Sequence, residues 1–252
     1  MAEDRVYTAC VIIIGNEVLS GRTRDANLQY LGERLNDLGI RLAEARVIRD
    51  DDKTIQNTVN ECRAAYDYVI TTGGIGPTHD DITSASIARA FGVELKRDAE
   101  AMALLKRHYN DGEFNEARQK MAHVPEGARL IKNPISSAPG FQVENVFVLA
   151  GVPMIMRAMF EELQDRLAGG RPMTSRTVAA HVTEGAMAAS MGVVQDTYTD
   201  VEIGSYPFYR KGRIGVSVVL RGAEGARVDA AAAEITSLIR SLGAEPVDEA
   251  DL

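Results

Sequence analysis

The sequence predicts an α/β protein: a three-layer αβα domain with a mostly parallel sheet over residues 1–168, then a small α+β domain over residues 173–252. Apolar, strand-like runs alternate with amphipathic helical segments in the first part, as expected for a parallel sheet with helices on both faces. Residues 168–172 read Ala-Gly-Gly-Arg-Pro, a composition typical of a linker. The order strand, helix, strand, strand, helix beyond the linker predicts a nearly ferredoxin-like sandwich, with one strand missing or supplied from elsewhere.

The first three strands and their helices follow one another in order. Residues 7–14 are apolar nearly throughout, as expected of a strand buried on both faces. The next segment carries four leucines at helical spacing: Leu28, Leu31, Leu35 and Leu38. Residues 42–48 form the second predicted strand, a helix follows over residues 55–66, and residues 68–72 form the third strand. Thr83 is the predicted cap of the next helix, which ends near residue 91.

The later elements are less regular. Residues 98–123 are predicted to be helical with a break near residues 110–112, residues 141–149 form a tight hairpin, and a helix begins at Pro153. In the second domain, the predicted elements in chain order are 174–183, 184–193, 202–203, 214–220 and 226–242. The last of these is an amphipathic helix, and both core packing and dimerisation remain open as its role.

Composition restricts the class of function. The chain has 252 residues and a net charge of -8, and an acidic surface repels nucleic-acid phosphates, so no nucleic-acid partner is expected. No run approaches the ~20 apolar residues that span a bilayer, and the N-terminus lacks the features of a signal peptide. Cys10 and Cys62 have no Cys-x-x-Cys spacing and are expected to be buried thiols in a reducing compartment. We therefore expect a soluble, cytoplasmic protein without a membrane partner.

Residues 71–83 form a glycine-rich loop that reads Thr-Thr-Gly-Gly-Ile-Gly-Pro-Thr-His-Asp-Asp-Ile-Thr. Glycines let a bulky anion touch the backbone, and the amides of the following helix would point at that anion. An ordinary strand-to-helix turn is the alternative. The loop lacks the glycine spacing of dinucleotide dehydrogenases and the Gly-Lys-Ser/Thr of P-loop ATPases. The predicted phosphate-binding residues are Thr72, Gly73, Gly74, Gly76, Pro77, Thr78 and Thr83.

Acidic residues surround this loop. Asp80 and Asp81 lie at its far end, and right-handed crossovers would place Gly15, Glu17 and Asp50 on the same edge of the sheet. Carboxylates in a first helical turn can simply complement the helix dipole. Beside a phosphate they also suit a divalent metal such as Mg²⁺, or an amino-substituted ring. The candidate metal ligands are Glu17, Asp50, Asp80 and Asp81.

The loop resembles the signature of the molybdopterin-binding (MoaB/Mog-like) domain, and it is similar to the matching domain of animal FAD synthases. Four further segments resemble the competence/damage-inducible protein A family: 14–21, 25–27, 124–128 and 133–141. The resemblance covers residues 6 to about 167. The second domain, with Gly-Ser-Tyr-Pro at residues 204–207, resembles the short module that follows in the same family.

This resemblance implies roles for particular residues. Asp50 and Asp81 fall on two acidic positions important in the molybdenum-cofactor proteins and are the candidate catalytic residues. Gly15, Asn27 and Lys120 are candidate ligand-binding residues. Lys120 falls on the family's Asn-Arg-Lys-Gln-Ala segment, although its flanking residues differ here.

The resemblance also implies an activity. The expected function is metal-dependent hydrolysis of an ADP-ribose- or FAD-like pyrophosphate. The alternative is non-hydrolytic binding of molybdopterin in molybdenum cofactor biosynthesis. Pterin and nucleotide ligands both need a phosphate cradle and ring contacts, so the residues leave that choice open. A homo-oligomer is expected from the family.

Overall fold

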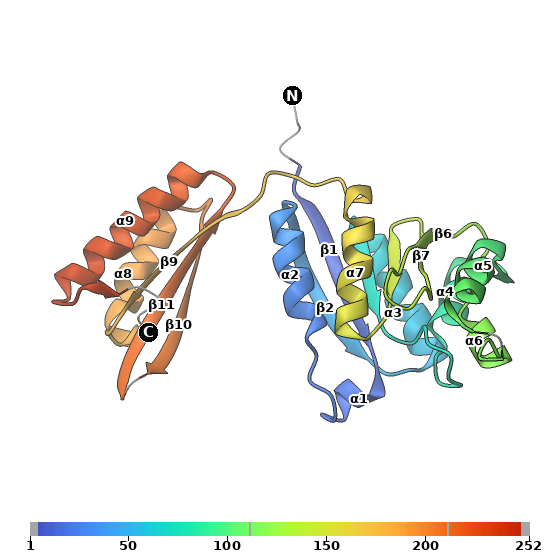
Figure 1. Cartoon of the computed structure of the whole chain (residues 1–252). Helices are drawn as coiled ribbons and strands as arrows, with labels where there is room; N and C mark the ends of the chain where they lie inside the picture. Colours follow the sequence, from blue (N-terminus) through green and yellow to red (C-terminus); the bar gives the residue numbers. More distant parts are fainter. Residues whose placement is uncertain (1–4, 111, 211, 248–252) are drawn as a thin grey trace. The chain divides into compact units, whose positions relative to one another are not determined.

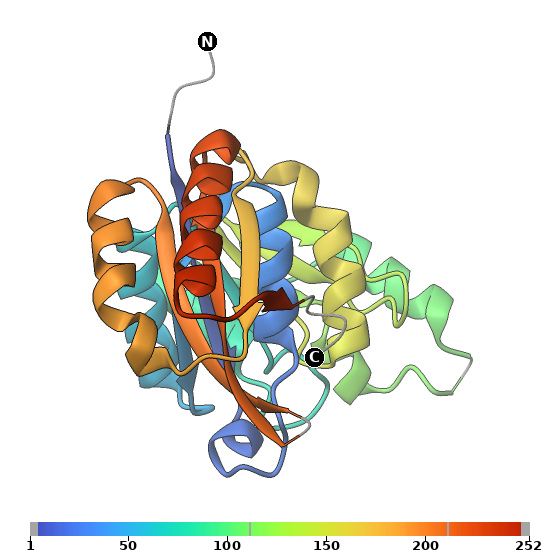
Figure 2. The same cartoon turned by 90° about the vertical axis from the view of Figure 1, so that its left-hand side faces the viewer.

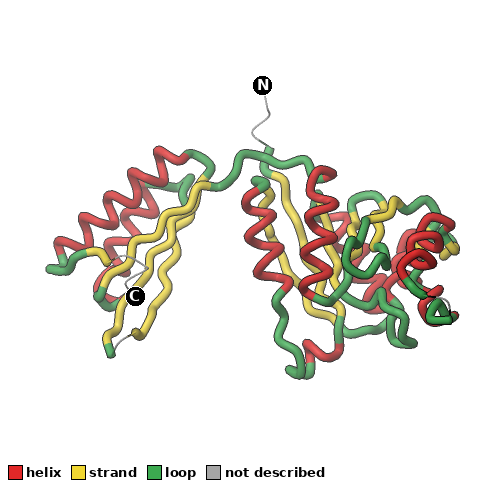
Figure 3. Tube along the Cα trace, viewed as in Figure 1, coloured by secondary structure: helices red, strands yellow, loops and turns green. Residues whose placement is uncertain are grey.

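The computed structural model describes residues 5–110, 112–210 and 212–247. The chain divides into two compact units, Met1–Gly170 and Arg171–Leu252. Figure 1 shows the course of the chain through both units, and Figure 3 shows that each contains helices and strands. Within the described ranges, no helix is both long enough and apolar enough to cross a membrane.

The first unit is built on a six-stranded sheet with the order β2-β1-β3-β8-β7-β6. Its strands are β1 (Tyr7–Ile14), β2 (Ile40–Ile48), β3 (Tyr68–Thr72), β6 (Arg129–Ile131), β7 (Gly140–Val143) and β8 (Val146–Leu149). The strands β2, β1, β3 and β8 are parallel, whereas β7 and β6 continue the sheet in antiparallel fashion. The predicted mostly parallel sheet is therefore confirmed.

Helices cover both faces of this sheet (Figures 1 and 2). The four main ones are α2 (Asn27–Asp37), α3 (Asp52–Ala65), α4 (Thr83–Phe91) and α7 (Pro153–Leu163). Val11 and Ile13 of β1 pack in a core with residues of α2 and α7, whereas Cys10 and Ile12 pack in a second core with residues of α3 and α4. Because β1 is buried on both sides, its sequence is apolar without alternation. The three-layer αβα prediction is confirmed.

The segment after α4 forms short elements that the sequence predicts only in part. They are β4 (Leu95–Arg97), α5 (Ala99–His108), α6 (Glu116–Lys120) and β5 (His123–Pro125). The expected helical break lies between α5 and α6, and both helices begin at side-chain caps, Asp98 and Asn115. The antiparallel pairing of β4 with β5 is not predicted, because three-residue strands carry no readable alternation. The short α1 (Asn16–Leu19) and the 3₁₀ turn η1 (Gln164–Arg166) complete this unit.

The second unit has a four-stranded antiparallel sheet with the order β10-β11-β9-β12 and two helices. Its elements are β9 (Thr174–Ala180), α8 (Glu184–Thr197), β10 (Glu202–Arg210), β11 (Arg213–Gly222), α9 (Gly225–Ser241) and β12 (Pro246–Val247). Both helices pack on the sheet in one core (Figure 3). The strand expected to be missing from the ferredoxin-like order is β12, from this same chain. The strand predicted at 202–203 extends to Arg210, because β10 is an edge strand where Pro207 is tolerated.

Candidate functional site

The glycine-rich loop leaves β3 in a conformation that only glycine accepts. Gly73 and Gly74 have φ angles of 106° and 69°. A Cβ atom on Gly73 would lie 2.1 Å from the carbonyl oxygen of Ile14, and one on Gly74 would lie 2.1 Å from Oγ1 of Thr83. The loop backbone therefore lies against the end of β1 and the start of α4, with no side chain between them.

Polar atoms without partners gather around these two glycines. Thr72 and Thr83 are 1% and 0% exposed, and their Oγ1 atoms have no hydrogen-bond partner in the part of the chain that the structure describes. Oδ1 of the buried Asn27 is also unpartnered, while its Nδ2 donates to the carbonyl of Gly151 over 2.8 Å. Gly151 in turn packs directly on Gly73. Buried polar groups are normally hydrogen-bonded, so such a concentration of unpaired ones indicates where a ligand would bind.

The N-terminus of α4 lies at the same place and contributes backbone amides. Thr83 is the first residue of this helix, and its amide donates to the carbonyl of Gly74 over 3.0 Å. No side chain caps the helix; its N-cap residue is Ile82. An uncapped helix N-terminus beside a glycine turn favours an anion, because its free amides carry partial positive charge.

The acidic end of the loop is organised by Thr78. Its Oγ1 lies 2.6 Å from Oδ1 of Asp80 and 2.5 Å from Oδ2 of Asp81, and its amide donates to Asp81 over 2.8 Å. The hydrogen bond from Thr78 holds the pKa of Asp80 below its usual value. Lys120 reaches the loop from α6 and donates from Nζ to the carbonyl of Thr78. Pro77 lies exposed on this loop.

A second pair of carboxylates lies at the ends of β1 and β2. The amide of Asn16 donates to Oδ2 of Asp50 over 2.8 Å, so Asp50 holds the start of α1. Glu17 of α1 folds back over Gly15, where an added Cβ atom would lie 2.5 Å from Oε1 of Glu17. The amide of Gly15 donates to the carbonyl of Ile48 over 3.0 Å, which fixes this turn to the end of β2.

The four candidate metal ligands thus lie at two places: Asp80 and Asp81 share the hydroxyl of Thr78, whereas Asp50 and Glu17 lie at the turn that follows β1. Among the described residues, no three of these carboxylates lie within 4.8 Å of one another. The structure does not assemble them into one compact cluster. A metal at this edge stays a prediction.

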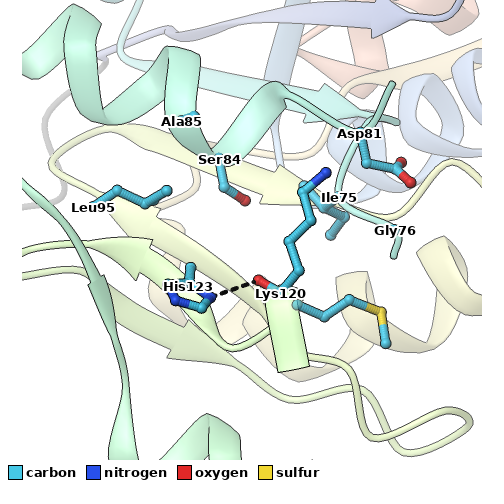
Figure 4. A pocket seen from close by; sticks show the side chains of 9 residues that line it. Ile75, Gly76, Asp81, Ser84, Ala85, Leu95, Lys120 and His123 are labelled. Carbon is cyan, nitrogen blue, oxygen red and sulfur yellow. Dashed lines mark hydrogen bonds between the residues drawn. The ribbon is translucent and has the colours of Figure 1, made fainter. Parts of the chain in front are cut away.

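A pocket of about 220 Å³ lies beside the loop. Figure 4 shows Lys120 extending across it toward Gly76 and Asp81, while Leu95 and His123 stand on the other side. The ring nitrogen Nδ1 of His123 lies 3.1 Å from the carbonyl oxygen of Lys120. The lining residues are Ile75, Gly76, Asp81, Ser84, Ala85, Leu95, Lys120, Met121 and His123. An apolar wall with polar groups at one end suits a flat ring.

The sequence predicts Gly76, Asp81 and Lys120 of this pocket as site residues, but not most of the other residues that line it. Leu95 and His123 are contributed by β4 and β5, the short strands that the sequence does not reveal. Gly151, which joins Asn27 to the loop, is also missed, because it lies 124 residues further along the chain. No local pattern signals these contacts.

Each of the two units is similar to a known protein family. Residues 10–169 match the family described as the probable molybdopterin binding domain, and residues 172–248 match the FAD synthase middle domain. A protein of Archaeoglobus fulgidus is 36% identical over 197 residues, which are 78% of this chain and 84% of that protein. A probable FAD synthase of Caenorhabditis elegans is 33% identical over 226 residues, 79% of this chain and 44% of that protein.

Relatives with other names are also similar to this chain. A CinA-like protein of Citrifermentans bemidjiense is 40% identical over 158 residues, which are 60% of this chain and 38% of that protein. The chain therefore spans less than half of that relative and of the C. elegans protein. The crystal structure of the protein CinA of Thermoplasma acidophilum, described as of unknown function, is similar with a TM-score of 0.61 and 34% identity over 64% of this chain and 98% of that one. Since the match at residues 10–169 covers more than half of its length, the chain belongs to the family of probable molybdopterin binding domains.

Proposed function

We propose that the first unit binds a small molecule in which a phosphate or pyrophosphate adjoins a ring, and that it hydrolyses a nucleotide pyrophosphate of the ADP-ribose or FAD type. One observation carries this proposal. The unpartnered hydroxyls of Thr72 and Thr83 meet an uncapped helix N-terminus at the turn of Gly73 and Gly74. Phosphate oxygens accept several hydrogen bonds at once and so suit this set of donors.

The neighbouring pocket supports the proposal that the ligand carries a ring. It adjoins the phosphate turn through Gly76 and presents the carboxylate of Asp81 and the ammonium of Lys120 beside an apolar wall. A carboxylate accepts hydrogen bonds from the amino group of a nucleobase or pterin, while the wall packs against the ring face. Its volume of about 220 Å³ suits a single ring system and leaves the rest of the ligand over the loop.

The carboxylates at these two places support the proposal that a divalent metal binds together with the ligand. Mg²⁺ is usually held by one or two protein carboxylates together with substrate phosphates, so a compact protein cage is not required. Asp80 with Asp81 on one side, and Asp50 with Glu17 on the other, offer such pairs at the edge where the phosphate would lie. A metal bound there would neutralise phosphate charge and lower the pKa of a water molecule. Lys120 and the start of α4 would orient the phosphates.

A second candidate is binding of molybdopterin without hydrolysis. The family match over residues 10–169 favours it, and the same loop and pocket would serve. The two candidates differ in whether a phosphoanhydride bond is broken. They share the donors of Thr72 and Thr83, so only the product of the reaction separates them.

The test is AMP release by the purified chain from ADP-ribose or FAD with Mg²⁺, Mn²⁺, Co²⁺ or Zn²⁺. We expect release that needs a metal and is reduced by about 100-fold or more in Asp81→Asn and Asp50→Asn, since general-base or metal-binding groups contribute effects of this size. Glu33→Gln, an exposed carboxylate on α2, is the matched control and should retain full activity. Absence of AMP with every ion, together with binding of molybdopterin, would reject hydrolysis in favour of the second candidate.

A further inference from the structure

A second polar cluster lies inside the first unit, away from the glycine-rich loop. Cys10 of β1 and Cys62 of α3 are both 0% exposed, and their Sγ atoms are 3.4 Å apart. The carboxylate of Glu44 on β2 joins them, so that three potential ligand atoms lie within 4.8 Å of one another. Cys10 precedes the end of β1 by four residues, which places the cluster roughly 13 Å from the loop edge.

A bulge in the sheet creates this arrangement. In the register of β1 with β2, Ala9 pairs with Leu42 and Cys10 pairs with Glu44, so Ala43 is an extra residue. The bulge places the Glu44 side chain opposite Cys10, on the face that α3 covers. Bulges often re-aim a functional side chain, and here the residue brought against two buried thiols is a carboxylate.

The carboxylate of Glu44 is held in position. The hydroxyl of Tyr66 donates to its Oε2 over 2.6 Å, and Nε of Arg46 donates to its Oε1 over 2.7 Å. A longer bond from Nη2 of Arg46 also reaches Oε2 over 3.4 Å, so three of the four lone-pair directions of the carboxylate are used and one remains for a further bond. Packing of two thiols in an apolar core would need none of these polar groups, so the core alone does not account for the cluster.

We propose that Cys10, Cys62 and Glu44 form a binding site for a zinc-class divalent cation, with water as the fourth ligand. Two thiolates and a carboxylate are ligands that Zn²⁺ prefers. Their three negative charges would be balanced by the two charges of the ion and the guanidinium of Arg46, which contacts Glu44 and also pairs with the largely exposed Glu61. A neutral set of this kind avoids the large cost of burying unpaired charge.

The geometry and the access of the cluster agree with this assignment. Zn–S bonds of about 2.3 Å at a tetrahedral angle place two sulfurs roughly 3.8 Å apart, so the thiols need to separate by only about 0.4 Å. The side chains of Glu44 and Arg46 are 33% and 30% exposed, so ions and water can reach the cluster from that side. The thiols form the closed side of the site, and the open position faces Glu44.

The test is a titration of the reduced, intact chain with Co²⁺, followed by displacement with Zn²⁺. We expect thiolate-to-cobalt charge-transfer absorption that saturates at one equivalent and disappears when Zn²⁺ is added. Cys62→Ser should lose this absorption. Tyr66→Phe should keep both thiolates and bind about 10- to 100-fold more weakly, because it removes the hydroxyl of one of the two residues that orient Glu44.

Asp81→Asn is the matched control, since it alters the loop edge and leaves the cluster intact; its absorption should be unchanged. Circular dichroism of Cys62→Ser and Glu44→Gln would show that each variant is folded. Absence of the absorption while both thiols react as free, or its persistence in folded Cys62→Ser, would overturn the proposal. Neither result affects the proposed function of the loop, which is measured by AMP release.

Discussion

The hydroxyl of Thr83 allows the contribution of one group to ligand binding to be measured separately from its contribution to folding stability. Its buried Oγ1 has no hydrogen-bond partner among the described residues, so Thr83→Val removes no hydrogen bond formed within them. We expect the free energy of unfolding to stay the same or to rise by about 1 kcal/mol, because an unsatisfied buried hydroxyl is costly. Affinity for ADP-ribose should fall about 10- to 100-fold, the value of a hydrogen bond to a charged group.

Thr54→Val is the reciprocal control for this prediction. Oγ1 of Thr54 donates to Asp51 over 2.7 Å at the start of α3, outside the glycine-rich loop. This variant should lose stability and keep its affinity. Urea unfolding and calorimetric titration measure the two quantities. A large loss of stability in Thr83→Val would show that the hydroxyl has a partner within the protein.

The loop glycines can be ranked by what surrounds them. Gly73 and Gly92 both have positive φ, but nothing lies within 4 Å of a Cβ atom built on Gly92, whereas one on Gly73 meets the carbonyl of Ile14 at 2.1 Å. Gly92→Ala should cost about 1 kcal/mol, for backbone conformation alone. Gly73→Ala should cost at least about 2 kcal/mol more, because backbone has to move. Similar unfolding free energies for the two variants would contradict this.

At the residue scale, interactions between residues that are close in the sequence can be predicted from it, whereas contacts between residues far apart in the sequence cannot. Three glycines and two aspartates in thirteen residues mark the loop, and Thr78 does organise both aspartates. The link from Asn27 through Gly151 to Gly73 spans most of the unit and depends on the packing of β8 against β3. An unpaired hydroxyl is a property of three-dimensional packing, so a threonine in the sequence cannot reveal it.

At the scale of elements, Tyr30 joins the two helices that cover one face of the sheet. Its hydroxyl donates to Oε1 of Glu161 over 2.5 Å and so links α2 to α7. Burial, and then the hydrogen bond to Glu161, raise the pKa of Tyr30 to about 12. The protonated form is favoured in the folded state. This contribution to stability is therefore complete below the unfolded pKa of about 10 and is lost as the pH rises through about 12.

The check is a series of urea unfolding curves between pH 8 and pH 12 for the parent chain and Tyr30→Phe. The parent should lose stability more steeply than the variant above about pH 10, since only the parent has this hydroxyl to ionise. Other groups titrate equally in both proteins and cancel in the difference. Parallel curves would mean that the Tyr30 hydroxyl ionises as readily in the folded chain as in the unfolded one.

Elements in which apolar residues recur at a regular spacing can be predicted from the sequence, whereas elements that depend on tertiary contacts cannot. The apolar run of β1 and the leucines of α2 identify these elements, because burial on known faces dictates their composition. Strand β2 begins at Ile40, two residues before its predicted start, because pairing with β1 extends it. Strands β4 and β5 are three residues each and exist by pairing with one another. The pocket residues that these two strands contribute therefore cannot be predicted from the sequence.

At the scale of the whole molecule, the two units have separate interiors. The buried cores of the first unit draw on residues up to Leu167, whereas the core of the second draws on residues from Val178 onward. Every residue assigned to the candidate site belongs to the first unit. The homo-oligomer expected from the resemblance stays a prediction, which light scattering of the intact chain would test.

Separate cores predict that the first unit is sufficient for binding. A chain ending at residue 171 keeps its whole sheet and all of its helices, and its size is that of an ordinary domain. We expect it to fold and to unfold in one calorimetric transition that matches one of two in the intact chain. It should bind ADP-ribose within about 3-fold of the intact affinity, since it retains every residue assigned to the site. A folded fragment whose affinity falls by more than about 10-fold, a loss of 1.4 kcal/mol, would show that the second unit contributes to the site.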